Sequence, residues 1–244
     1  NVFNKTSVLD DEPEEQARSA TLQTSVGHVV WRATKINIID TPGEGSFFGD
    51  TRAAIAAADA VILIVSAKDG VQPMTERVNG WAVEMGLPRY VVFTKCDLEH
   101  VRVSTAIEAV KKRLKISLAT MQVPIGEGTD MKGVVELVGR KVFVGKAEGP
   151  NAKSTTEIPA DVKDAVNNAR ALLVDDVASA AGNDELAEKY LEEGDLTDKE
   201  MESGLNKAIA GGTIVPAFFV GSMGPHGAAA LLDAIVDLFP SPNK

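Results

Sequence analysis

The chain has 244 residues, 44% of them hydrophobic, so it can bury a sizeable core as one large α/β domain or two smaller ones. Its formal net charge of −10 argues against direct binding of duplex DNA, and no apolar run approaches membrane-spanning length, so we expect a soluble, cytoplasmic protein without a membrane partner. The single cysteine, Cys96, excludes an internal disulfide and a cysteine-based zinc site.

The amino-terminal part predicts a loop followed by a hairpin. Residues 1–20 are polar and acidic without a sustained period, which indicates a mobile loop. Residues 26–31 alternate in part and lead by a turn into 35–40, which favours an antiparallel hairpin. The second segment also has the alternating isoleucines of a buried parallel strand, and it ends abruptly in Asp40-Thr41-Pro42-Gly43, at the strand end where open α/β sheets bind ligands.

The next stretch alternates between helices and strands, as parallel sheets require. An alanine-rich helix is predicted over 51–60, a fully buried strand over 61–65 and a helix over 74–85 whose apolar stripe packs on the sheet. Residues 90–93 form another apolar strand, which ends in Thr94-Lys95-Cys96-Asp97. A further sheet-covering helix is expected after Asp97, with apolar residues at Val103, Ile107, Val110 and Leu114.

From about residue 121 the pattern changes to short antiparallel strands followed by helices. Residues 157–207 carry fourteen acidic against five basic residues, so most of the negative charge lies there. Such a segment reads either as a solvated face or as a protein-docking surface. The core resumes with a strand at 214–219, a loop at 221–223 and a closing helix over 231–239.

Two strand-end motifs in this order resemble those of the translational GTPases. Asp40-Thr41-Pro42-Gly43 matches Asp-x-x-Gly, and Thr94-Lys95-Cys96-Asp97 is a variant of the guanine-specifying Asn-Lys-x-Asp. Within that family the chain looks like elongation factor G, above all its second, paralogous form, over essentially its whole length. The resemblance implies an α/β fold with a P-loop-GTPase-like, mostly parallel sheet flanked by helices. It divides the chain into a GTP-binding core, 1–120 and 211–244, and an inserted α+β subdomain, 121–210.

The resemblance implies a guanine site at the second motif. Asp97 would accept the two N–H donors on one edge of guanine, a pair that adenine cannot make. Lys95 would lay its aliphatic stem over the base. Thr94 replaces the usual asparagine, so one side chain that ties neighbouring loops together is lost. Ser222-Met223 corresponds to the fifth motif, whose backbone meets the guanine carbonyl oxygen; a plain strand-to-helix loop is the alternative.

It also implies a phosphate and magnesium site at the first motif. Asp40 would hold Mg2+ through water, and the Gly43 N–H would meet the γ-phosphate. Aligning Arg18-Ser19-Ala20-Thr21 with the family's Arg-Gly-Ile-Thr makes Thr21 the other magnesium ligand, although a surface threonine that opens the next strand is the alternative. Glu44 occupies the place of the histidine that orients the attacking water. A carboxylate there adds repulsion beside the γ-phosphate, so hydrolysis should be slow or altered.

One family motif is absent from these residues: no Gly-x-x-x-x-Gly-Lys-Ser/Thr occurs. In the family this phosphate loop follows a first strand that lies between the segments corresponding to 36–39 and 61–65. We therefore expect the chain to be a piece of a longer protein, with a gap at that place in the sheet.

The sequence thus favours the GTP-binding domain of an elongation-factor-G-like translation factor that binds GTP/GDP with Mg2+ and hydrolyses GTP slowly. Its expected partners are the ribosome, through the full-length protein, and a ribosomal stalk protein at the acidic insert. Ribosome-protection and release-factor GTPases share the same motifs. The alternative from another class is a non-hydrolysing, degenerate GTPase fold that docks a protein, which Glu44, Thr94 and the missing phosphate loop favour. An unrelated metabolic enzyme has little support, because no nucleophile–base pair is visible.

Overall fold

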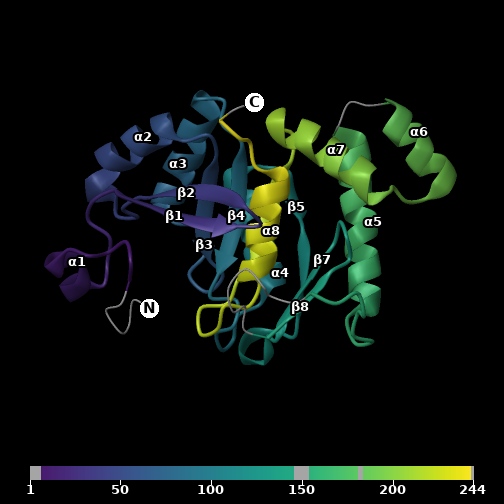
Figure 1. Cartoon of the computed structure of the whole chain (residues 1–244), viewed down its shortest axis with the longest axis horizontal. Helices are drawn as coiled ribbons and strands as arrows, with labels where there is room; N and C mark the ends of the chain where they lie inside the picture. Colours follow the sequence, from purple (N-terminus) through teal and green to yellow (C-terminus); the bar gives the residue numbers. More distant parts are fainter. Residues whose placement is uncertain (1–6, 146–153, 181–183, 243–244) are drawn as a thin grey trace.

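A computed structural model of the chain describes residues 7–145, 154–180 and 184–242, and its centre is a parallel sheet covered by helices (Figure 1). The sheet has four strands in the order β3, β4, β9, β5, all parallel. These strands are Val61–Ser66, Arg89–Thr94, Val215–Phe219 and Leu118–Thr120. Strands β4 and β9 lie in the middle; the four central residues of β4 and all of β9 are buried, as expected of strands covered on both faces.

Helices cover both faces of this sheet. They are α2 (Phe48–Ala57), α3 (Pro73–Glu84), α4 (Val103–Leu114) and α8 (Ala228–Leu238). Because side chains alternate along a strand, Val91 and Phe93 pack with α3 and α4, whereas Tyr90 and Val92 pack with the end of α8. The predicted mostly parallel α/β architecture is therefore confirmed.

The predicted hairpin is confirmed as β1 (Ser25–Trp31) paired antiparallel with β2 (Thr34–Asp40). Within the part of the chain that the structure describes, 36–39 is not a buried strand of the four-stranded parallel sheet, which differs from the expectation. Among the described residues β2 pairs only with β1, so the two form a separate sheet and Ile38 is 40% exposed. The fully buried strand at 61–65 was also wrong in part: β3 is an edge strand that pairs only with β4 in the described chain, and its Ile64 is 59% exposed.

The amino-terminal stretch is more ordered than predicted. Residues 1–6 of the expected loop lie outside the described residues, but Pro13–Arg18 forms helix α1 instead of loop. Proline in the first turn and the acidic Glu14 and Glu15 near the positive helix end both favour helix formation. Glu15 is buried and accepts hydrogen bonds from the N–H groups of the segment 22–23 at 2.8 and 3.2 Å.

The strands and helices predicted after residue 121 are present. Strands β6 (Gln122–Ile125), β7 (Gly133–Glu136) and β8 (Val142–Val144) form an antiparallel sheet. Helices α5 (Lys163–Ala180), α6 (Asp184–Glu193) and α7 (Asp198–Ala210) follow, and short 3-10 turns occupy Gly45–Phe47 (η2) and Gly128–Asp130 (η3). Helix α7 begins at a capping box, in which Thr197 and Glu200 satisfy each other's backbone N–H groups.

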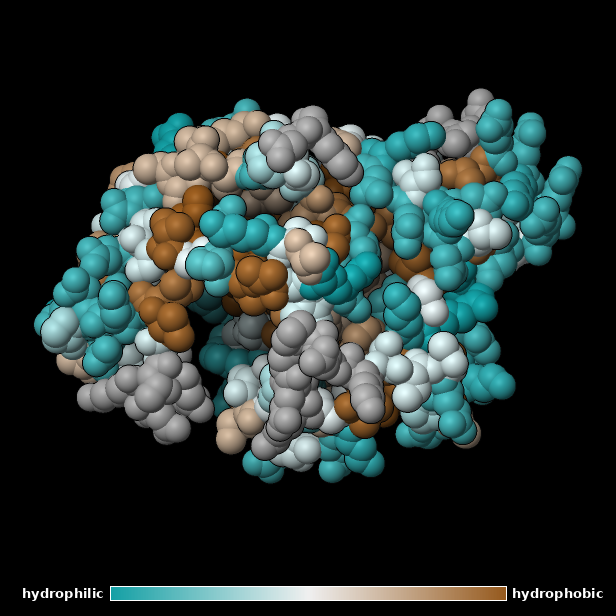
Figure 2. Space-filling model, in the orientation of Figure 1, coloured by the Kyte–Doolittle hydropathy of each residue, from teal (hydrophilic) through white to brown (hydrophobic). Residues whose placement is uncertain are grey.

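Hydrophilic and hydrophobic residues gather on different parts of the surface. Figure 2 shows hydrophilic residues over α6 and α7 and hydrophobic residues near the β1–β2 hairpin. The exposed apolar side chains of the hairpin include Val26, Val30 and Ile38. No helix in the described part of the chain is long and apolar enough to cross a membrane.

Candidate functional site

The ends of β4 and β9 bring Asp97 against the loop that follows Phe219. The two strands are parallel neighbours, so their carboxyl ends meet at one edge of the sheet. The Asp97 Oδ1 atom accepts hydrogen bonds from the backbone N–H and the hydroxyl of Ser222, at 2.6 and 3.0 Å. Its Oδ2 atom accepts from the N–H groups of Met223 and Gly224, at 2.7 and 3.1 Å. The structure therefore brings Asp97 together with Ser222 and Met223, which follow it by more than a hundred residues in sequence.

These contacts keep Asp97 ionised although it is only 6% exposed. Burial alone would raise the pKa of the Asp97 carboxyl, but the N–H groups of Ser222, Met223 and Gly224 lower it, and the net pKa lies below 3.8. A carboxyl whose pKa is lower in the folded than in the unfolded chain stabilises the fold above its unfolded pKa, and this stabilisation is lost as pH falls through the folded pKa.

We therefore expect Asp97→Asn to cost stability in a pH-dependent way. Between pH 5 and 7 the loss in unfolding free energy should be constant. It should shrink as pH falls from the pKa of Asp97 in the unfolded chain toward its lower pKa in the folded chain, because the parent chain then loses the same stabilisation. Urea unfolding at a series of pH values measures the difference. Asp59→Asn, at an exposed site without a hydrogen-bond or ion-pair partner among the described residues, is the matched control. An Asp97→Asn difference that does not change between pH 7 and pH 3 would contradict this assignment.

Lys95 lies two residues before Asp97, and its ammonium group contacts Asp69, a residue that the sequence analysis did not identify. The Lys95 Nζ atom lies 2.9 Å from Asp69 Oδ2, in the turn after β3. The Ser66 hydroxyl, at 2.6 Å, and Lys95 lower the pKa of Asp69. Lys95 itself has a φ of 60°, in the left-handed region. Asp69 could have been found from its position, because it follows the end of the strand next to β4.

Thr94 ends β4 and holds the neighbouring turn through its backbone. Its carbonyl oxygen accepts a hydrogen bond from the N–H of Ala67 at 2.9 Å. This bond joins the ends of β3 and β4, the two strands whose turns carry Asp69 and Lys95. A backbone bond of this kind does not depend on the side chain at position 94.

The loop after β2 carries the residues predicted to face phosphate. The Thr51 hydroxyl is buried and donates to the Pro42 carbonyl oxygen at 3.0 Å, which fixes the loop against α2. A Cβ atom at Gly43 would meet nothing within 4 Å, so packing within the chain does not require glycine there. Glu44 is exposed just before η2, and its Oε1 atom accepts a hydrogen bond from the Ser46 hydroxyl at 3.2 Å.

Thr21 and Asp40 belong to an acidic neighbourhood. The Thr21 hydroxyl donates to Asp10 Oδ1 at 2.8 Å. Burial raises the pKa of Asp40, and the charges of Asp10 and Glu15 raise it further, against a backbone hydrogen bond that lowers it. Sequence reasoning missed Asp10, whose only signal was its place in an acidic run. Within the described ranges no three or more His, Cys, Asp or Glu side chains are grouped to hold a metal ion.

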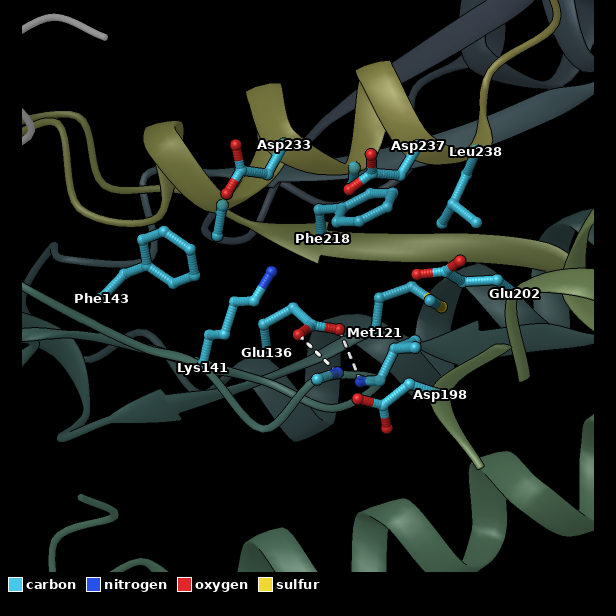
Figure 3. A pocket seen from close by; sticks show the side chains of 14 residues that line it. Met121, Glu136, Lys141, Phe143, Asp198, Glu202, Phe218, Asp233, Asp237 and Leu238 are labelled. Carbon is cyan, nitrogen blue, oxygen red and sulfur yellow. Dashed lines mark hydrogen bonds between the residues drawn. The ribbon is translucent and has the colours of Figure 1, made fainter. Parts of the chain in front are cut away.

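A cavity of about 120 Å³ lies elsewhere, between β7, α7 and α8 (Figure 3). None of the predicted site residues lines it. Its charged side chains are Lys141 and five carboxylates, Glu136, Asp198, Glu202, Asp233 and Asp237. A ligand that carries phosphate would be repelled by this excess of negative charge, so the cavity is not the nucleotide site.

Comparison with known proteins agrees with the strand-end motifs. The family model of the elongation factor Tu GTP binding domain matches residues 1–241. A crystal structure of a protein from Thermus thermophilus superimposes with a TM-score of 0.86 at 29% sequence identity; the match covers 100% of this chain and 36% of that protein. The chain thus spans little more than a third of the length of this structural relative. It belongs to the family of the elongation factor Tu GTP-binding domain, the GTP-binding domain of translational GTPases.

Proposed function

We propose that this chain is the nucleotide-binding domain of an elongation-factor-G-like translation factor, with Asp97 as the residue that recognises guanine. The observation that carries the proposal is the meeting of Asp97 with the 222–224 backbone at the adjoining ends of β4 and β9. Guanine offers two N–H donors on one edge, which suit a carboxylate, and a carbonyl oxygen, which suits backbone N–H groups such as those of Ser222 and Met223. The aliphatic stem of Lys95 would cover the base, with Asp69 holding its ammonium group.

The phosphates would lie near the loop after β2. Gly43 leaves room for close approach to its N–H, because no neighbour stands where a Cβ would be. The oxygens of Thr21 and Asp40 suit Mg2+, a hard cation, and a cation there would relieve the repulsion that Asp10 and Glu15 exert on Asp40. When bound, Mg2+ supplies positive charge against the phosphate oxygens.

A phosphate cradle is not found among the described residues, and the sheets indicate where one would attach. Strands β2 and β3 each have an unpaired edge in the described chain, with Ile38 and Ile64 exposed beside them. We propose that a further strand and its phosphate loop add between these edges. The added strand would pair the free backbone groups of both strands and cover both isoleucines.

Two observations suggest binding partners: the negative charge of helices α5 to α7, and the greater length of the Thermus relative. The acidic helices α5 to α7, proposed as part of an inserted unit over 121–210, offer a surface for a basic partner, for which a ribosomal stalk protein is our proposal. The ribosome would be engaged by the full-length protein, since this chain spans only 36% of its Thermus relative. Such a factor would act in the cytoplasm.

Glu44 sets the expected rate of hydrolysis. It is exposed beside the proposed phosphate site, and as a carboxylate it would repel the γ-phosphate. We expect Glu44→His to raise basal or ribosome-stimulated GTP turnover by about tenfold or more, since a positioned imidazole can orient and deprotonate water. Phosphate release at saturating GTP measures the change.

Glu44→Gln is the matched control for this substitution. It removes the negative charge without supplying an imidazole. If only Glu44→His raises GTP turnover, hydrolysis is slow because the attacking water is not oriented. If both variants raise turnover equally, hydrolysis is slow because Glu44 repels the γ-phosphate. No change with either variant would place the defect outside position 44.

The proposal as a whole is tested by measuring phosphate release from GTP by the full-length protein, with and without ribosomes. Slow release that ribosomes stimulate is expected. The second candidate, a non-hydrolysing docking module, is favoured by one specific observation: the hydrogen-bonding capacity of Asp97 is already taken up within the chain. Absence of both guanine nucleotide binding and phosphate release under either condition would select that candidate.

A further inference from the structure

The four hydrogen bonds to Asp97 fill its capacity as an acceptor. An ionised carboxylate has about four lone-pair positions, and here each oxygen accepts two donors from residues 222–224. Asp97 is also almost completely buried. No position on the carboxylate therefore remains for the two N–H donors of a base.

From this geometry we propose that the loop 221–227 is a latch over the base site, which must open before guanine binds to Asp97. The inference rests on the proposed function, because it concerns the same carboxylate. Guanine would replace the N–H donors of Met223 and Gly224, which share Oδ2. The freed N–H groups would then face the base.

The loop is held close to Asp97 by its glycines and by bonds at its two ends. A Cβ at Gly221 would lie 2.7 Å from Asp97 Oδ2, so only glycine allows this approach. The Gly221 N–H donates to the His226 carbonyl oxygen at 2.9 Å, which closes the loop on itself. Gly227 has a φ of 80°, and a Cβ there would lie 2.1 Å from the Phe219 carbonyl oxygen. The loop thus begins and ends at a glycine. We expect its backbone dihedral angles to change at these two residues when it opens.

Little besides these hydrogen bonds resists opening. Met223, at the tip of the loop, is 74% exposed, so its displacement uncovers almost no apolar surface. The latch therefore works as a pre-equilibrium. It weakens the apparent affinity for every nucleotide by the same factor, the fraction of open molecules, and it limits the binding rate to the rate of opening.

Hydrogen exchange on the nucleotide-free chain tests the latch without any ligand. The amides of 222–224 should be protected in the parent chain and in Asp59→Ala, the matched exposed control. In Asp97→Ala they should exchange about tenfold faster or more, because charge-assisted hydrogen bonds are lost. Equal exchange in the parent chain and Asp97→Ala would overturn the latch.

Stopped-flow mixing of the parent chain with a fluorescent GDP analogue and Mg2+ gives a second test that needs no variant. The observed rate should level off as the analogue concentration rises, at the rate of loop opening. A linear rise to the highest concentration would overturn the latch even if the amides are protected. Absence of any binding would count against the proposed function instead, and the exchange result alone would then decide whether the loop is latched.

Discussion

Replacing Asp97 with asparagine is expected to change the base preference of the chain from guanine to xanthine nucleotides. Guanine donates N1–H and the 2-amino group to the Asp97 carboxylate, whereas an asparagine side chain offers one acceptor and one donor group. Xanthine carries a carbonyl oxygen in place of the amino group, so it can accept from the asparagine amide. A site that hydrogen-bonds its ligand and is left with mismatched buried groups discriminates strongly, and we expect GDP affinity to fall by about a hundredfold or more.

Competition of GDP and XDP against a fluorescent analogue measures this preference in the parent chain, in Asp97→Asn and in Asp59→Asn. The exposed control should keep the preference of the parent chain. An unchanged preference in Asp97→Asn would remove Asp97 from the base site. The latch does not obscure the comparison, because loop opening weakens the affinity for both nucleotides by the same factor.

The second large effect is expected at Arg170, which holds the region after β6 together. Arg170 is 5% exposed on α5. Its Nη1 atom donates to the carbonyl oxygens of Leu137 and Val138 at 2.6 and 2.7 Å, and its Nη2 atom donates to that of Leu196 at 2.8 Å. Asp195 lies 3.2 Å from the guanidinium and supplies the counter-charge. One side chain thus joins α5, the turn after β7 and the link between α6 and α7.

Arg170→Met should lower the free energy of unfolding by about 3–5 kcal/mol, because three buried hydrogen bonds from a charged donor are lost together. Methionine fills much of the volume of the arginine stem, so most of the loss comes from the three carbonyl oxygens left without a donor. Urea unfolding followed by circular dichroism measures it. The matched control is Arg113→Met, whose half-exposed ion pair with Glu76 should contribute about 1 kcal/mol or less. Equal losses in the two variants would contradict the role given to Arg170.

The strand-end residues could be predicted because parallel strands deliver their carboxyl ends to one edge. Asp97 and Ser222 each follow an apolar strand, and those strands turned out to be neighbours. Asp69 and Gly224 were not foreseen as their partners, because such contacts depend on how the loops bend after the strands end. The sequence therefore predicts where β4 and β9 end, but it does not predict the path of the loops that follow them.

Pairing and burial were harder to predict than the elements themselves. The isoleucines around Ile38 suggest a buried strand, but burial depends on which strand lies alongside, and in the described chain β2 has only β1. Arg170 shows the converse: it lies on the same helix as the buried Val166 and Leu173 and is buried with them. Its carbonyl partners lie 26 to 33 residues away in sequence, so no local pattern reveals them.

The most direct test of the account is a titration of the chain with a fluorescent GDP analogue in the presence of Mg2+, competed separately by GTP and ATP. The account predicts saturable binding that GTP displaces and ATP does not, because only guanine presents two donors to Asp97. Equal displacement by ATP would contradict the role of Asp97. No saturable binding would contradict nucleotide binding by this chain and make protein docking the leading function.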